Sequence, residues 1–136
     1  MRKAIVDTNI LLRLLVKDDD AQRKACERLL AKAKEKEILL YVLPVSILEI
    51  VWVLEKYYKL ERAAIRELVE AILNTPELKC EMDAMLKKAI EVYEEKNIKF
   101  ADAVIGRWGI EKGISEVFTY DKKDFRRIEG LKVHKP

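Results

Sequence analysis

Four carboxylates of this chain stand in or directly after runs of apolar residues, where a single negative charge is costly. They are Asp7, Glu49, Asp102 and Asp121. A buried carboxylate strongly destabilises a fold unless it is paired with a cation or binds a metal ion. Because no Lys or Arg near them in the sequence reads as buried, we expect the four acids to share a divalent cation. This constellation predicts a metal-dependent enzyme that acts on phosphodiesters.

Two of the acids follow predicted strands. Asp7 ends the apolar run 4–6, and Asp121 follows the run 117–120; both runs read as buried strands. Ligands of open parallel sheets bind beyond the carboxyl ends of the strands. We therefore expect Asp7 and Asp121 at the same edge of one sheet.

The other two acids fall in predicted helices. Glu49 is the only charge between residues 44 and 54, and Asp102 lies in the apolar segment 100–105. Glu49 stands one to two turns into a helix that follows a strand, and Asp102 stands in the first turn of its helix. Both positions allow the side chains to reach the edge where Asp7 and Asp121 are expected.

The apolar periodicity predicts strands that alternate with helices. Strands are expected at residues 2–6, 38–43, 78–81, 116–119 and 131–133. Helices are expected at residues 8–16, 20–36, 45–58, 61–74, 83–96 and 101–112, the last capped by Gly113. Continuously apolar strands separated by helices indicate a parallel sheet covered on both faces.

The donor set favours a hard cation. Carboxylate oxygens suit Mg²⁺ or Mn²⁺, and the chain offers no cluster of His or Cys ligands. Each acid also has a purely structural alternative. Asp7 could cap a helix, and Glu49 could reach solvent. Asp102 could be a first-turn carboxylate that the helix dipole stabilises, and Asp121 and Asp124 could be turn or cap residues.

Composition limits the class of protein. The 136 residues fit one domain, 1–136, and the net charge of +3 permits nucleic-acid binding without arguing for it. The charged fraction of 38% predicts a thermophilic source. The two cysteines read as buried thiols, and the sequence shows neither a signal-peptide layout nor an apolar run that could span a bilayer. We therefore expect a cytoplasmic protein without membrane contact.

Four short motifs resemble those of PIN-domain ribonucleases, in the same order. They are Ile-Val-Asp-Thr-Asn-Ile at 5–10, Pro-Val-Ser-Ile-Leu-Glu at 44–49, Phe-Ala-Asp-Ala at 100–103 and Phe-Thr-Tyr-Asp-Lys-Lys-Asp-Phe at 118–125. The resemblance covers essentially the whole chain, and the compact length is similar to that of VapC-type toxins of toxin–antitoxin pairs.

The resemblance implies a fold, an activity and partners. The fold would be a PIN-like three-layer α/β/α sandwich with a central parallel sheet. The activity would be Mg²⁺- or Mn²⁺-dependent cleavage of single-stranded RNA. The metal ligands, direct or through water, would be Asp7, Glu49, Asp102 and Asp121, with Asp124 as a further candidate. The implied partners are RNA, a small antitoxin protein and a second copy in a homodimer.

Other classes fit less well. A haloacid-dehalogenase phosphatase would need a second Asp two residues after Asp7, where this chain has Asn9. A receiver domain would need paired acids after the first strand, and a P-loop enzyme would need its glycine pattern. A non-catalytic nucleic-acid-binding or scaffold protein that keeps the fold remains an alternative. Metal-dependent RNA cleavage would distinguish the nuclease from this alternative.

Overall fold

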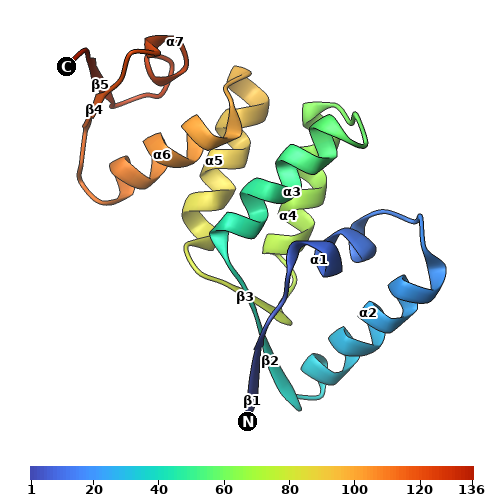
Figure 1. Ribbon diagram of the computed structural model, residues 1–136. Coiled ribbons are helices and arrows are strands. Elements are labelled where there is room, and N and C mark those ends of the chain that lie inside the picture. The colour runs from blue at the N-terminus through green and yellow to red at the C-terminus, as the bar shows by residue number, and fades with distance from the viewer.

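The computed structural model describes residues 1–136 as five parallel strands and seven helices (Figure 1). The strands are β1 Arg2–Ile5, β2 Ile38–Val42, β3 Leu78–Cys80, β4 Glu116–Phe118 and β5 Lys132–His134. The helices are α1 Thr8–Leu15, α2 Asp20–Lys34, α3 Pro44–Lys56, α4 Arg62–Leu73, α5 Asp83–Lys96, α6 Phe100–Glu111 and α7 Lys122–Phe125. Every predicted element is present within two residues of its predicted bounds. Only α7 was missed, because four residues are too few to show a helical period.

The strands form two separate sheets. One sheet has the order β1-β2-β3, and the other contains only β4 and β5. All pairings are parallel, and the backbone N–H of Val6 extends the β1–β2 pairing by donating to the Tyr41 carbonyl at 2.8 Å. The predicted α/β fold with parallel strands is confirmed. The sheet is nevertheless divided, because β4 lies apart from β1 instead of pairing with it (Figure 1).

Strands β1 and β4 carry exposed apolar side chains, which corrects the expectation of buried strands there. The central strand β2 is buried, with Leu40 and Val42 each 1% exposed. In contrast, Ile5 of β1 is 69% exposed and Phe118 of β4 is 66% exposed. β1 ends in Ala4-Ile5 and β4 ends in Val117-Phe118, and each strand has a hydrogen-bonded neighbour on one side only.

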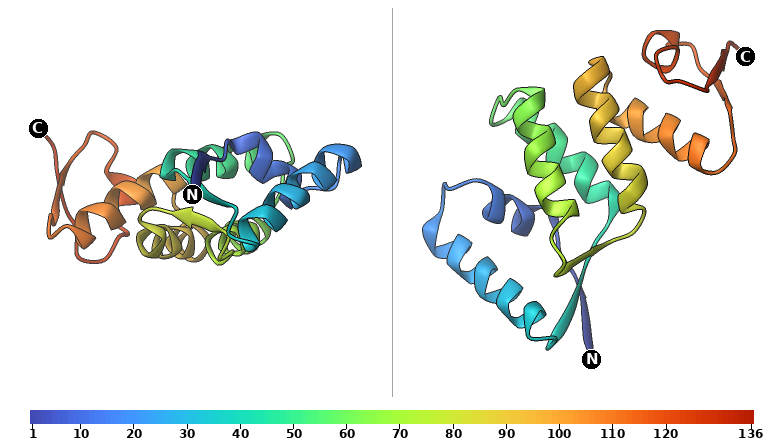
Figure 2. Two further views of the ribbon diagram at one scale, coloured as in Figure 1. Left: turned by 90° about the horizontal axis from the view of Figure 1, so that it is seen from below. Right: turned by 180° about the vertical axis from the view of Figure 1, so that it is seen from behind.

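One hydrophobic core of 25 buried residues runs through the molecule. Helices lie on both sides of β1–β3, as the view from below in Figure 2 shows. The core is centred on α3, α4 and α5, through residues such as Ile50, Ile65 and Ile90. The core continues to Phe125 and Ile128, so the chain after α6 is packed against the helices.

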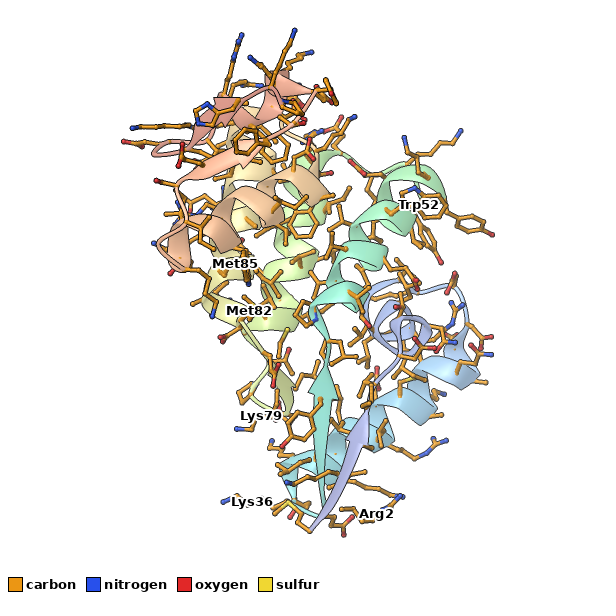
Figure 3. The ribbon with its side chains drawn as sticks, turned by 60° about the vertical axis from the view of Figure 1, so that its left-hand side comes forward. Arg2, Lys36, Trp52, Lys79, Met82 and Met85 are labelled. Carbon is orange, nitrogen blue, oxygen red and sulfur yellow. The ribbon has the colours of Figure 1, made fainter.

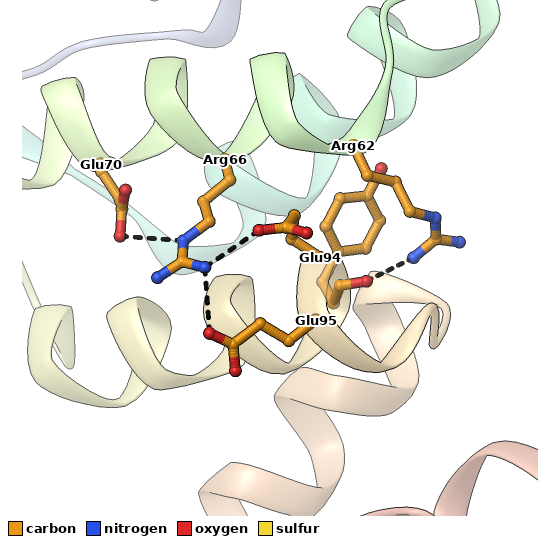
Figure 4. Close-up of polar contacts among 6 residues, drawn as sticks. Arg62, Arg66, Glu70, Glu94 and Glu95 are labelled. Carbon is orange, nitrogen blue, oxygen red and sulfur yellow. Dashed lines mark hydrogen bonds and ion pairs between the residues drawn. The ribbon is translucent and has the colours of Figure 1, made fainter.

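The turn between α5 and α6 is held by Arg62 of α4. Its guanidinium donates hydrogen bonds of 2.7 Å to the carbonyls of both Tyr93 and Ile98, and it stacks 4.2 Å from the centre of the Tyr93 ring. Figure 4 shows Arg62 on α4 with one of these hydrogen bonds. The Tyr93 hydroxyl in turn donates to Glu55 of α3 at 2.7 Å. These contacts fix how the chain leaves α5, and they therefore fix the direction of α6.

The end of α6 follows the predicted glycine cap. Gly113 has a φ of +75°, a left-handed conformation that glycine adopts without strain. The N–H of Ile114 closes the turn by donating to the Gly109 carbonyl at 2.8 Å. The cap ends the helix and sends the chain into β4.

None of the helices combines the length and the apolar character that crossing a lipid bilayer requires.

Candidate active site

Asp7 lies where β1 ends and α1 begins. Its side chain is exposed, and its Oδ1 accepts a 2.8 Å hydrogen bond from the N–H of Thr8, so Asp7 caps α1. Thr8 itself is buried, which fixes the backbone next to the carboxylate. The expectation that Asp7 is buried is wrong, because the neighbouring edge of β1 is open. The cap holds one oxygen in place and leaves the carboxylate accessible.

Glu49 is also exposed, although its sequence neighbours are apolar. Helix α3 buries one stripe, which includes Ile47 and Ile50, against the core, and it turns Glu49 outward. The side chain lines a cleft of about 1030 Å³ whose walls are an apolar face of α3, including Trp52, and the segment 99–101 at the start of α6. Figure 3 shows Trp52 on the outer side of α3.

The remaining three acids lie near one another at the start of α6 and of α7. Asp102 is half-buried in the first turn of α6. Burial raises its pKa, and the nearby carboxylates of Asp124 and Asp121 raise it further, while Lys99 lowers it. A carboxylate with a raised pKa beside like charges gains most from an added cation.

Asp124 and Asp121 are held in different ways. Asp124 is 8% exposed, and its Oδ2 accepts a 3.0 Å hydrogen bond from the N–H of Lys99. Asp121 is exposed; its N–H donates to Thr119 Oγ1 at 3.0 Å, and its carboxylate lies 3.9 Å from the Lys99 ammonium. We call Asp102, Asp121 and Asp124 the acidic cluster.

The predicted acids come from two parts of the chain. Asp7 and Glu49 belong to the part of the chain built on β1–β3, whereas the acidic cluster belongs to the part that contains β4. No group of three or more His, Cys, Asp or Glu side chains is arranged to hold a metal ion in the single chain. The donor chemistry fits a hard divalent cation, and Glu49 lines the same cleft as residues 99–101, next to the acidic cluster.

The basic residues around these acids are partly engaged. Arg13 pairs with Asp18, and Arg107 pairs with Glu111 at 3.2 Å, so each guanidinium already contacts a carboxylate. Arg126 is exposed on the segment after the acidic cluster. Sequence reasoning missed Lys99, which contacts two acids of the cluster, because a single Lys before a helix carries no distinctive pattern.

Residues 4–131 match the model of the PIN domain, and the chain therefore belongs to the PIN-domain family. The predicted family is confirmed. Among individual proteins, the chain is 30% identical over 132 residues to the VapC ribonuclease of Aquifex aeolicus, a match that covers 97% of this chain and 96% of that protein. A solved structure that resembles it is VapBC2 from Rickettsia felis bound to a DNA fragment from its promoter. That match has 19% identity, a TM-score of 0.39 and coverage of 100% and 99% of the two chains.

Proposed function

We propose that this protein is a divalent-metal-dependent endoribonuclease that cleaves single-stranded RNA, as the toxin of a toxin–antitoxin pair. The observation that carries the proposal is the likeness to a VapC ribonuclease over 97% of the chain, within a PIN-domain match over residues 4–131. The acidic residues that the sequence singled out supply the chemistry that such a reaction needs.

The metal ligands in this proposal are Asp7, Glu49, Asp102 and Asp121, with Asp124 as a further ligand or as the residue that orients them. A bound Mg²⁺ or Mn²⁺ activates water and stabilises the charge that develops on the scissile phosphate. Thr8 holds one oxygen of Asp7 through its N–H, and Thr119 fixes the backbone at Asp121. Both contacts limit the freedom of a carboxylate before it binds the ion.

RNA and a small antitoxin are the proposed partners, and the cytoplasm is the proposed location. Exposed cations next to the acidic cluster, among them Lys123 and Arg126, suit a polyanionic substrate. Lys99, 3.9 Å from Asp121, provides a further positive charge at the cluster.

The experiment is cleavage of a fluorescent single-stranded RNA by the full chain. We expect cutting with Mg²⁺ or Mn²⁺, its loss with excess EDTA, and its recovery when the metal is restored. An RNA cut at the same rate in EDTA would contradict metal dependence. No cutting of any RNA by folded protein that binds the metal would contradict the nuclease.

The second candidate is a non-catalytic protein that keeps the fold for binding. It is favoured by the finding that no three His, Cys, Asp or Glu side chains of the single chain are arranged to hold a metal ion. It predicts that RNA is bound but not cut, so the same cleavage experiment with a parallel binding measurement decides between the two functions.

A further inference from the structure

Lys99 borders both the cleft of Glu49 and the acidic cluster. It is the residue before α6, directly after the turn whose Ile98 carbonyl is bound by Arg62. Its side chain lines the cleft that also contains Glu49, and its ammonium lies 3.9 Å from the Asp121 carboxylate. One cation of this chain is therefore placed beside acids that come from different helices.

The backbone of Lys99 is fixed, whereas its side chain is held only loosely. The N–H of Lys99 donates to Oδ2 of the buried Asp124 at 3.0 Å. In contrast, the Lys99 side chain is 73% exposed, and the side chain of its partner Asp121 is 63% exposed. Because 3.9 Å is longer than a hydrogen bond, the pair is an electrostatic contact that water can separate.

Lys99 forms the ion pair of the acidic cluster. Burial and the charge of Asp124 raise the pKa of Asp102, and the charge of Lys99 opposes both effects. Neighbouring carboxylates repel one another in the absence of a metal ion, and a nearby ammonium lowers this cost. Lys99 is thus the counter-ion that the chain itself supplies to the cluster.

Lys99 competes with a divalent cation for the same carboxylates. Oxygen ligands lie about 2.0–2.1 Å from a bound Mg²⁺, so they are neutralised far better by that ion than by an ammonium at 3.9 Å. Lys99 then loses its partner, but its backbone stays bound to Asp124. The ammonium therefore remains at the cluster and is available to another anion.

The cleft next to Lys99 suits a single strand of nucleic acid. Its wall carries Trp52, which is 60% exposed, and the cation Lys56. Unpaired bases stack on exposed aromatic side chains, while their phosphates follow nearby positive charges. The surroundings of Lys99 therefore match a phosphate that belongs to a strand.

We propose that Lys99 is a positioning residue with two alternating partners. Without a divalent cation its ammonium pairs with the acidic cluster, and with the cation bound it holds a phosphate oxygen of the RNA strand at the cleft. The proposal rests on the proposed function, because both partners belong to metal-dependent cleavage of RNA. Lys99 makes and breaks no covalent bond.

Three variants separate the charge of Lys99 from its place in the fold. Lys99→Met removes the charge and keeps the backbone N–H that binds Asp124, and Lys99→Arg keeps the charge. The matched control is Lys112→Met, at an exposed residue that caps the other end of α6. A helix of this length spans about 18 Å, which exceeds the Debye length of about 8–10 Å. All three variants are expected to fold, as circular dichroism checks.

The first test is the affinity for Mn²⁺ without RNA, measured by isothermal titration at about 0.1 M salt. Lys99→Met is expected to bind Mn²⁺ about 3–10-fold more tightly than wild type, because one repelling charge is removed from beside the ion. Lys99→Arg and Lys112→Met are expected to match wild type. Equal or weaker binding by Lys99→Met overturns the proposal.

The second test is RNA cleavage at saturating Mn²⁺. Lys99→Met is expected to raise KM about 5-fold with little change in kcat, since an exposed contact to phosphate contributes to binding alone. The slope of log KM against log salt should fall by about 0.7, the value for one phosphate of a single strand. Lys99→Arg is expected to restore both values. An unchanged KM and salt slope in Lys99→Met overturns the phosphate contact.

The two tests together exclude a purely structural role for Lys99. A damaged site would lose affinity for both Mn²⁺ and RNA, whereas the proposal predicts a gain for the ion and a loss for the strand. An active wild type that Lys99→Met matches in both tests contradicts the proposal and leaves the nuclease standing. A wild type that binds Mn²⁺ but cuts no RNA contradicts the nuclease, and the salt slope of RNA binding then decides whether Lys99 contacts phosphate. A wild type that binds no Mn²⁺ contradicts both.

Discussion

At the residue scale, the types of the candidate residues were predictable but their environment was not. Three of the four acids singled out by apolar neighbours are exposed, namely Asp7, Glu49 and Asp121. An apolar neighbourhood in sequence indicates burial only when all sides of the segment are covered. Here β1 and β4 each have a hydrogen-bonded neighbour on one side only, and α3 turns Glu49 away from the core, so all three carboxylates are exposed to solvent.

Asp102 is the acid whose environment has a measurable consequence for stability. Its pKa is raised in the folded state, mainly by burial and then by Asp124, so the folded protein binds this proton more tightly than the unfolded chain does. Protonated Asp102 therefore contributes to the free energy of unfolding, and this contribution is fully present below the unfolded pKa of about 3.9. The contribution is lost as pH rises through the pKa of Asp102 in the folded state. The charged form therefore weakens the metal-free fold at neutral pH.

We expect Asp102→Asn to raise the thermal midpoint of the metal-free protein at pH 7, and the difference from wild type to vanish near pH 3. The measurement is thermal unfolding in EDTA at both pH values. Asp20→Asn serves as the control, because Asp20 is exposed in the first turn of α2 and its loss should lower the midpoint slightly. A destabilised Asp102→Asn at pH 7 would contradict the assigned cause.

At the element scale, periodicity located every helix of eight residues or more and every strand, since these patterns depend on local burial. It did not predict that the sheet is divided between β1 and β4. Strand pairing joins residues far apart in the chain, and the run 4–6 has the same sequence whether its neighbour comes from its own chain, from a second copy or from no strand at all.

Arg62 of α4 binds the turn that precedes α6. Arg62→Met removes two hydrogen bonds to carbonyls and a cation–π contact, and we expect it to lower the free energy of unfolding by about 2–4 kcal/mol. Urea unfolding measures the change.

The control for that variant is Arg66→Met, one turn further along α4. Arg66 forms partly exposed ion pairs with Glu70, Glu94 and Glu95 (Figure 4). Such pairs contribute about 0–1 kcal/mol, so the loss should be smaller than for Arg62→Met. Equal losses in the two variants would show that charge rather than carbonyl binding holds the turn.

At the scale of the whole molecule, the chain length predicted from composition to hold one domain agrees with a family match over residues 4–131. The arrangement of the β1–β3 sheet relative to the β4–β5 pair could not be predicted from one sequence. The prediction of a single domain over 1–136 and the prediction of a thermophilic source both remain predictions.

The charged fraction of 38% leads us to expect a thermal midpoint above the mesophile range of about 45–65 °C. Calorimetry at several protein concentrations measures it, and the midpoint of a dimer should also rise with concentration. A midpoint inside the mesophile range would contradict the thermophilic assignment, whatever the state of association.

The most direct test of the central claim is the rate of Mg²⁺-dependent RNA cleavage by wild type, Asp7→Asn and the control Asp20→Asn. Loss of a metal-binding carboxylate should exceed the roughly 10–100-fold loss typical of residues that only orient a ligand. We therefore predict that Asp7→Asn is folded and more than about 100-fold slower, while Asp20→Asn cuts at the wild-type rate. If folded Asp7→Asn cuts RNA as fast as wild type, Asp7 is a helix cap only and the proposed metal site is wrong.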